Sequence, residues 1–125
     1  MPVAFWCVFA AALLPYFAVG FAKAGPDYDN RMPRSWATSL DGRRARAHAA
    51  HQNGLEAFPF FASGVVIATL TDAPPNLVDM LSVIFVTARI GYTAAYIADK
   101  ATLRSVLWLV GLGAVIGLFL APLSH

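Results

Sequence analysis

Four long apolar stretches alternate with short polar segments along the 125-residue chain. The spans that they predict cover about residues 2–22, 44–70, 77–98 and 103–123, and the second of these becomes apolar only around Leu55. Each is close to the ~20 residues that an α-helix needs to cross a bilayer. Their apolar runs are continuous, whereas the strands of a membrane β-barrel alternate apolar and polar residues. The pattern predicts an all-α integral membrane protein, a four-helix bundle that forms one domain over residues 1–125.

Prolines and polar residues mark the ends of these helices. The second helix is expected to begin in a polar segment near Gly42, and a turn at Thr71–Pro75 separates it from the third. Pro15 and Pro59 predict bends within the first and second helices. A signal peptide would begin with basic residues, but residues 1–22 carry no charge. We therefore expect the first stretch to be a retained span.

Composition supports the same class of protein. Hydrophobic residues make up 58% of the chain and charged residues 13%, which is too little charge to cover a small soluble domain. The net charge of +2 is too small to indicate a nucleic-acid-binding protein. The single cysteine, Cys7, cannot form an internal disulfide and is expected to be a small buried apolar residue.

Basic residues are concentrated in two of the three loops. Six lie between Lys23 and Arg46, two lie at Lys100 and Arg104, and the loop at residues 71–75 has none. Because basic loops remain in the cytoplasm, loops 23–46 and 99–104 are predicted to be cytoplasmic and both termini to lie outside. The first loop is expected to be solvated or to contact anionic lipid headgroups.

Two charged residues, Glu56 and Arg89, fall inside predicted spans. Such residues usually face the bundle interior or a water-filled cavity. At 1.5 Å per residue, Arg89 lies roughly 13 Å below the cytoplasmic end of its span, and Glu56 lies near the same side. We expect an ion pair between them, which either serves only to hold the helices together or belongs to a functional site.

Other polar residues gather at the same level of the predicted bundle. Helical spacing places one stripe on the second helix and another on the third, and further polar residues begin the fourth: Arg46, Asn53, Glu56, Arg89, Tyr92, Tyr96, Arg104 and Ser105. Individually, the tyrosines could be interface anchors and Arg104 a loop cation. Together they predict a cationic, donor-rich pocket for a small anion with several carboxylates.

Three further features indicate structure more than chemistry. His48 and His51 have a spacing that could bind metal, but no third ligand is well placed. Asp79 is expected in the first turn of the third helix, where a carboxylate favours the helix dipole. The small residues between Gly111 and Gly117 favour close helix packing.

Two motifs resemble a known family. Residues 46–60 contain Asn53-x-x-Glu56 followed by a proline, and residues 88–96 read Ala-Arg-Ile-Gly-Tyr-Thr-Ala-Ala-Tyr before Leu-Arg-Ser-Val at 103–106. Together with the four-span plan, they resemble bacterial-type members of the membrane-associated proteins in eicosanoid and glutathione metabolism, the MAPEG family. The resemblance covers nearly the whole chain. It implies a homotrimer in the bacterial inner membrane, with glutathione bound between subunits.

The resemblance also implies roles for individual residues. Asn53 and Glu56 would hold the amino and peptide groups of glutathione, and Tyr92 and Tyr96 would line its site. Arg104 would stabilise the thiolate, which attacks a lipophilic electrophile from the membrane, and Ser105 matches a serine implicated in some members. Arg89 would lie deep in the site. Arg46 and Lys23 would stand in for family arginines as further glutathione-binding residues.

The chain departs from the family pattern at positions that carry arginine in other members, where it has Ala49, Gln52 and Lys23. Three functions therefore remain open at this point. The first is a glutathione-dependent transferase or peroxidase, and the second is a non-catalytic family member that binds a small anionic or lipidic ligand. The third is a small four-span exporter, which is disfavoured because the first span lacks an acidic residue.

Overall fold

Each of the four apolar stretches forms a long helix in the computed structural model, which describes residues 1–124. A short helix precedes the second of them, and a 3₁₀ turn (η1) follows the last: α1 Val3–Lys23, α2 Pro33–Thr38, α3 Gly42–Leu70, α4 Pro75–Ile97, α5 Ala101–Leu120 and η1 Ala121–Leu123. Residues 1–124 contain no strand. All four long helices are long and apolar enough to cross a membrane, so the predicted all-α membrane bundle is confirmed.

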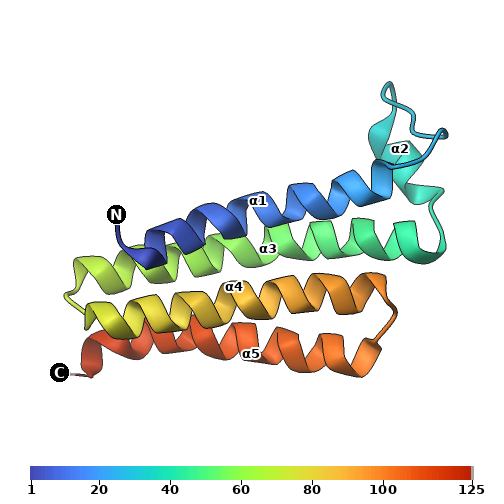
Figure 1. Ribbon diagram of the computed structural model, residues 1–125. Helices are drawn as coiled ribbons and strands as arrows, with labels where there is room; N and C mark the ends of the chain where they lie inside the picture. Colours follow the sequence, from blue (N-terminus) through green and yellow to red (C-terminus); the bar gives the residue numbers. More distant parts are fainter. Residues whose placement is uncertain (125) are drawn as a thin grey trace.

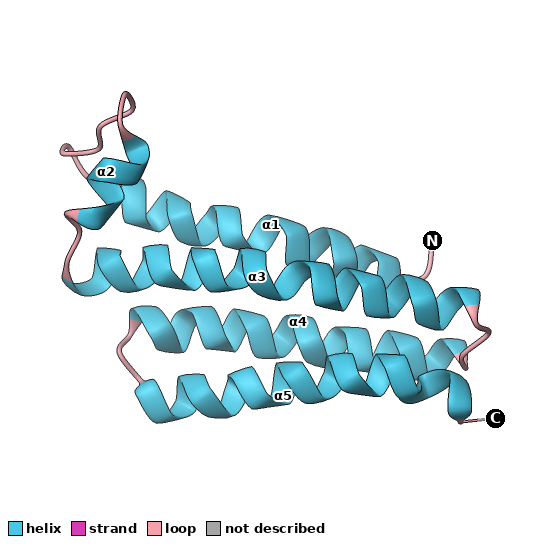
Figure 2. Ribbon diagram, turned by 180° about the vertical axis from the view of Figure 1, so that it is seen from behind, coloured by secondary structure: helices cyan, strands magenta, loops and turns pink. Residues whose placement is uncertain are grey.

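Consecutive long helices run antiparallel to one another, and both termini lie at one end of the bundle (Figure 1). Helix α1 packs along α3 and α4 packs along α5, while contacts of α4 with α1 and α3 join the two pairs. The loop between α1 and α3, which includes α2, lies at the other end, beside the turn between α4 and α5 (Figure 2). The two basic loops are therefore neighbours.

Small residues allow α1 and α3 to pack closely. The buried face of α1 has one such residue at nearly every turn: Ala4, Cys7, Ala11, Pro15, Ala18 and Ala22. Opposite Pro15, a Cβ added to Gly54 would lie 2.9 Å from the proline Cγ, so only glycine fits here without a shift. Cys7 is buried, as predicted.

Larger side chains fill the space between α3, α4 and α5. The rings of Phe61 and Phe85 stack with centroids 4.0 Å apart, and Leu118 is completely buried beside them. The outer surface is also rich in apolar side chains, including Phe17 and Leu109. Extended apolar exposure of this kind is expected where lipid or another subunit replaces water.

Helix α2 and the loop around it were not expected from the sequence. Trp36 of α2 is 6% exposed and packs against Ala22 and Ala47. Arg44 attaches this loop to the bundle: its Nε donates a hydrogen bond to the carbonyl of Ala22 at 2.9 Å, and its Nη2 lies 2.8 Å from an Asp27 carboxylate oxygen. The nearby guanidinium holds the pKa of the Asp27 carboxyl below its ordinary value.

The start of α4 corrects one expectation. The helix begins at Pro75, because proline is tolerated at the first helical position, where its missing N–H would have no intrahelical partner. Asp79 therefore lies in the second turn and not in the first. Its carboxylate accepts a hydrogen bond from the backbone N–H of Ala4 at 2.9 Å, so it attaches the start of α1 to α4.

Candidate functional site

Arg89 lies in the middle of α4 and is the one buried charged residue among residues 1–124, at 4% exposed. Its guanidinium carbon lies 4.1 Å from the centroid of the Tyr92 ring. Its Nη2 is buried and has no hydrogen-bond partner in the described part of the chain. A buried cation with an unused donor is costly unless an anion or acceptor reaches it, which makes Arg89 the natural centre of a binding site.

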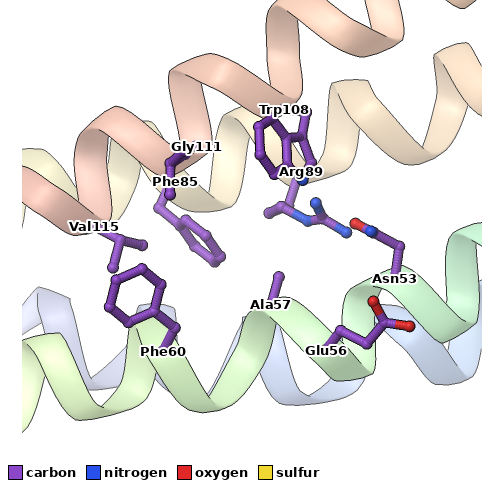
Figure 3. A pocket seen from close by; sticks show the side chains of 10 residues that line it. Asn53, Glu56, Ala57, Phe60, Phe85, Arg89, Trp108, Gly111 and Val115 are labelled. Atoms are coloured by element: carbon purple, nitrogen blue, oxygen red, sulfur yellow. The ribbon is translucent and has the colours of Figure 1, made fainter.

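The predicted ion pair between Glu56 and Arg89 is wrong. Within residues 1–124, the single ion pair closer than 4.0 Å joins Arg44 and Asp27. Glu56 lines the same cleft as Arg89, but its side chain is exposed and lies near Asn53 (Figure 3). Arg89 instead stays buried against the face of Tyr92, where cation–π attraction replaces the carboxylate.

A cleft of about 220 Å³ opens between α3, α4 and α5, and Arg89 contributes to its wall. Its polar end holds Asn53, Glu56 and Arg89. The Asn53 amide and the Arg89 guanidinium point toward one another there (Figure 3). The Asn53 Oδ1 is also buried without a hydrogen-bond partner in residues 1–124. Two unsatisfied polar groups in one cleft favour a polar ligand, because buried polar groups are nearly always hydrogen-bonded.

Two aromatic rings lie between two cations from the cleft to the basic end of the bundle. Beyond the Arg89–Tyr92 contact, the Tyr92 and Tyr96 rings meet edge to face with centroids 5.7 Å apart. The guanidinium carbon of Arg104 then lies 4.5 Å from the Tyr96 centroid. This arrangement connects α4 with the first turn of α5.

Arg46 joins the basic end of this arrangement. Its Nε donates a hydrogen bond to the carbonyl of Ile97 at 3.2 Å, in the last turn of α4. Arg46, Tyr96 and Arg104 border one small hollow together with Lys100. The structure thus brings the predicted residues into two neighbouring groups, one in the cleft and one at the α4–α5 turn, with Tyr92 between them.

Two predicted site residues lie outside these groups. Ser105 is exposed and does not line the cleft. Lys23, at the end of α1, has its Nζ 4.9 Å from the centroid of the Tyr28 ring. Lys23 lines a separate cavity of about 720 Å³ between α1, α2 and α3, which also contains His48, His51 and Gln52. On a single chain, Lys23 therefore faces a different surface from Arg89.

The two histidines have an arrangement of their own. His51 Nδ1 lies 2.8 Å from the carbonyl oxygen of Pro15, and because a carbonyl only accepts, Nδ1 carries the proton. The ring centroids of His48 and His51 are 5.9 Å apart. Residues 1–124 contain no group of three metal-ligating side chains. The hydrogen bond of His51 joins α3 to α1 at the proline of α1.

Sequence reasoning missed the apolar end of the cleft. Its walls are aromatic and aliphatic side chains from all three helices: Phe60, Phe85, Trp108, Leu112 and Val115. Helical spacing could have found some of them, because Phe85 precedes Arg89 by four residues and Trp108 follows Arg104 by four. In an apolar span, however, one face rich in Phe and Trp does not stand out from lipid-facing surface.

A comparison with protein families gives a match over most of the chain. A model of the MAPEG family matches residues 3–124, nearly the whole chain. The chain belongs to the MAPEG family. MAPEG proteins are membrane proteins generally associated with glutathione. No curated protein and no solved structure matches the chain.

Proposed function

We propose that this MAPEG protein is a glutathione-dependent transferase or peroxidase that acts on lipophilic electrophiles. One observation carries the proposal: Arg89 and Asn53 each have a buried polar atom with no hydrogen-bond partner among the described residues, and both line a cleft that Glu56 also lines. A zwitterionic peptide needs hydrogen-bond donors for its carboxylates and acceptors for its ammonium group. The cleft also has an apolar end for a partner that arrives from lipid.

The residues present suit glutathione. The guanidinium of Arg89 can donate to a carboxylate or peptide carbonyl, while the carboxylate of Glu56 can accept from an ammonium group. Asn53 offers both functions from one side chain. Arg46 and Arg104 add positive charge at the loop end, which suits a ligand with two carboxylates. The rings of Tyr92 and Tyr96 lie between the guanidinium groups of Arg89 and Arg104.

Arg104 is the group we assign to thiolate stabilisation, with Ser105 as a neighbouring hydroxyl. A free thiol has a pKa near 8.5 and is largely protonated at neutral pH. A guanidinium next to the sulfur favours the anion, and each unit of lowered pKa corresponds to ~1.4 kcal/mol. When bound, glutathione supplies this thiolate, which forms a C–S bond with an electrophile as a leaving group departs with the electron pair. With a hydroperoxide, the thiolate would attack the terminal oxygen, the O–O bond would break and the alkoxide would leave as the alcohol, and a second glutathione would convert the resulting sulfenic acid to the disulfide and water.

In a homotrimer, Lys23 of one subunit would lie near the cleft of its neighbour. On one chain, Lys23 lies in the α1–α3 cavity, apart from the cleft. If glutathione binds between subunits, this basic surface of one copy would face the cleft of the next. We further propose a bacterial inner membrane with loops 23–46 and 99–104 in the cytoplasm, in accordance with their basic residues.

Ultraviolet absorbance of the thiolate tests the proposal in purified, detergent-solubilised protein. Adding glutathione should produce a thiolate signal in the wild type that is lost in Arg104→Ala. Arg43→Ala is the matched control, because Arg43 is exposed and outside both groups of site residues. Equal signals in all three proteins would contradict the assignment of Arg104. No glutathione binding would instead favour a non-catalytic member that binds another anionic or lipidic ligand.

A further inference from the structure

The apolar end of the cleft has a rim and a floor. Phe60 of α3 and Trp108 of α5 are 46% and 41% exposed and stand at the rim on opposite sides (Figure 3). Phe85 and Val115 form the floor and are almost fully buried. Three of these four side chains are aromatic, and flat rings favour stacked or edge-to-face contacts with other rings.

Gly111 leaves the floor of the cleft open. A Cβ added there would lie 3.7 Å from the Phe85 ring and 3.8 Å from Arg89 Cδ, both ordinary contacts. The first carbon of a side chain would therefore fit, and any further atoms would extend into the cleft. At Gly113, two residues later, an added Cβ would have no neighbouring atom within 4 Å, so a side chain there would point away.

The apolar end of the cleft lies deeper in the bundle than Arg104. Trp108 is one helical turn beyond Arg104 on the same side of α5, about 6 Å deeper. Arg89 borders both Gly111 and the polar end. A molecule held between Phe60 and Trp108 would thus lie beside Arg89 and deeper in the membrane than Arg104, the residue that we assign to the thiolate of glutathione.

We propose that Trp108 and Gly111 select the electrophile, restricting it to compact aromatic molecules. The selection rests on the proposed function. The electrophile has only the apolar part of the cleft, because the polar end is assigned to glutathione, and even the whole cleft, at about 220 Å³, is below the ~300–1,000 Å³ of pockets that enclose drug-sized ligands. One or two rings fit between the rim aromatics, with Gly111 providing space beneath them. A long acyl chain would not fit in this space, because Phe85 and Val115 close the floor beneath it.

Binding of chlorodinitrobenzene, a compact aromatic electrophile, tests the selection without glutathione. In a Trp6→Phe, Trp36→Phe background, Trp108 is the remaining tryptophan, and the nitroaromatic should quench its fluorescence. Gly111→Leu should weaken this binding by about tenfold or more, whereas Gly113→Leu should bind as the parent does. Equal binding by both leucine variants would overturn the proposal.

Turnover with glutathione provides a second readout. The wild type should conjugate chlorodinitrobenzene faster than it reduces linoleic acid hydroperoxide, and Trp108→Ala should raise KM for the aromatic more than it lowers kcat. Preference for the long-chain hydroperoxide, or an unchanged KM, would overturn the selection even if Gly111→Leu fails to fold. A thiolate signal that persists in Trp108→Ala separates these failures from failure of the proposed function.

Discussion

The guanidinium carbon of Arg89 lies 4.1 Å from the centroid of the Tyr92 ring, and both side chains are buried in the bundle. No carboxylate lies within ion-pair distance of Arg89 in the described residues. The ring therefore supplies the attraction that keeps this cation in a largely apolar setting. It also leaves Nη2 available to a ligand, which an ion pair with Glu56 would not.

Replacing Tyr92 tests this relationship. Tyr92→Leu should lower the free energy of unfolding by about 0.5–2 kcal/mol, because the cation–π contact is lost. Tyr92→Phe keeps the ring and should retain most of that stability. Thermal unfolding in detergent provides the measurement. Equal losses in both variants would mean that the phenol hydroxyl, and not the ring, supports Arg89.

Close packing of α1 on α3 makes a second prediction. Gly54→Val should destabilise the protein by about 1–3 kcal/mol, because its Cβ would overlap Pro15 and force the helices apart. Gly113→Val adds the same atoms where no neighbour lies within 4 Å, so it should change stability little. Denaturation of the two variants side by side compares them, and a Gly54→Val protein as stable as Gly113→Val would contradict the observed packing.

Acid should loosen the loop that contains α2. The folded-state pKa of Asp27 is lowered by Arg44, so its contribution to stability is complete above the ordinary carboxyl pKa of about 4. That contribution is lost as pH falls through the lower folded-state value. Cleavage within residues 24–41 by an acid-stable protease should rise over this range. Asp27→Asn should be cleaved readily at higher pH as well, and an unchanged cleavage profile in Asp27→Asn would show that the ion pair does not secure the loop.

The sequence predicted the four membrane helices because predominantly apolar runs of this length have few alternatives. Helical spacing also predicted that Arg89, Tyr92 and Tyr96 share one face of α4, as their contacts confirm. Side-chain direction was harder to predict. Two charges at one depth suggested an ion pair, yet Glu56 stays at the exposed edge of the cleft while Arg89 lies on a ring three residues away.

The remaining differences between prediction and structure concern residues whose neighbours come from distant parts of the chain. Nothing near Lys23 indicates that the end of α1 faces a cavity covered by α2, because that depends on how Trp36 packs and how Arg44 holds the loop. Asp79 likewise reads as a helix-dipole residue until the start of α1 is placed beside it. Such contacts join residues that are far apart in sequence, and the local pattern contains no signal for them.

Glutathione binding to Arg89→Met tests the central claim most directly. Methionine keeps much of the side-chain volume but removes the buried cation that would contact glutathione in the cleft. Isothermal titration in detergent should show glutathione binding to the wild type and to Arg43→Ala, and its loss in Arg89→Met. Arg89→Met that is folded and binds glutathione as tightly as the wild type would show that the ligand lies outside this cleft.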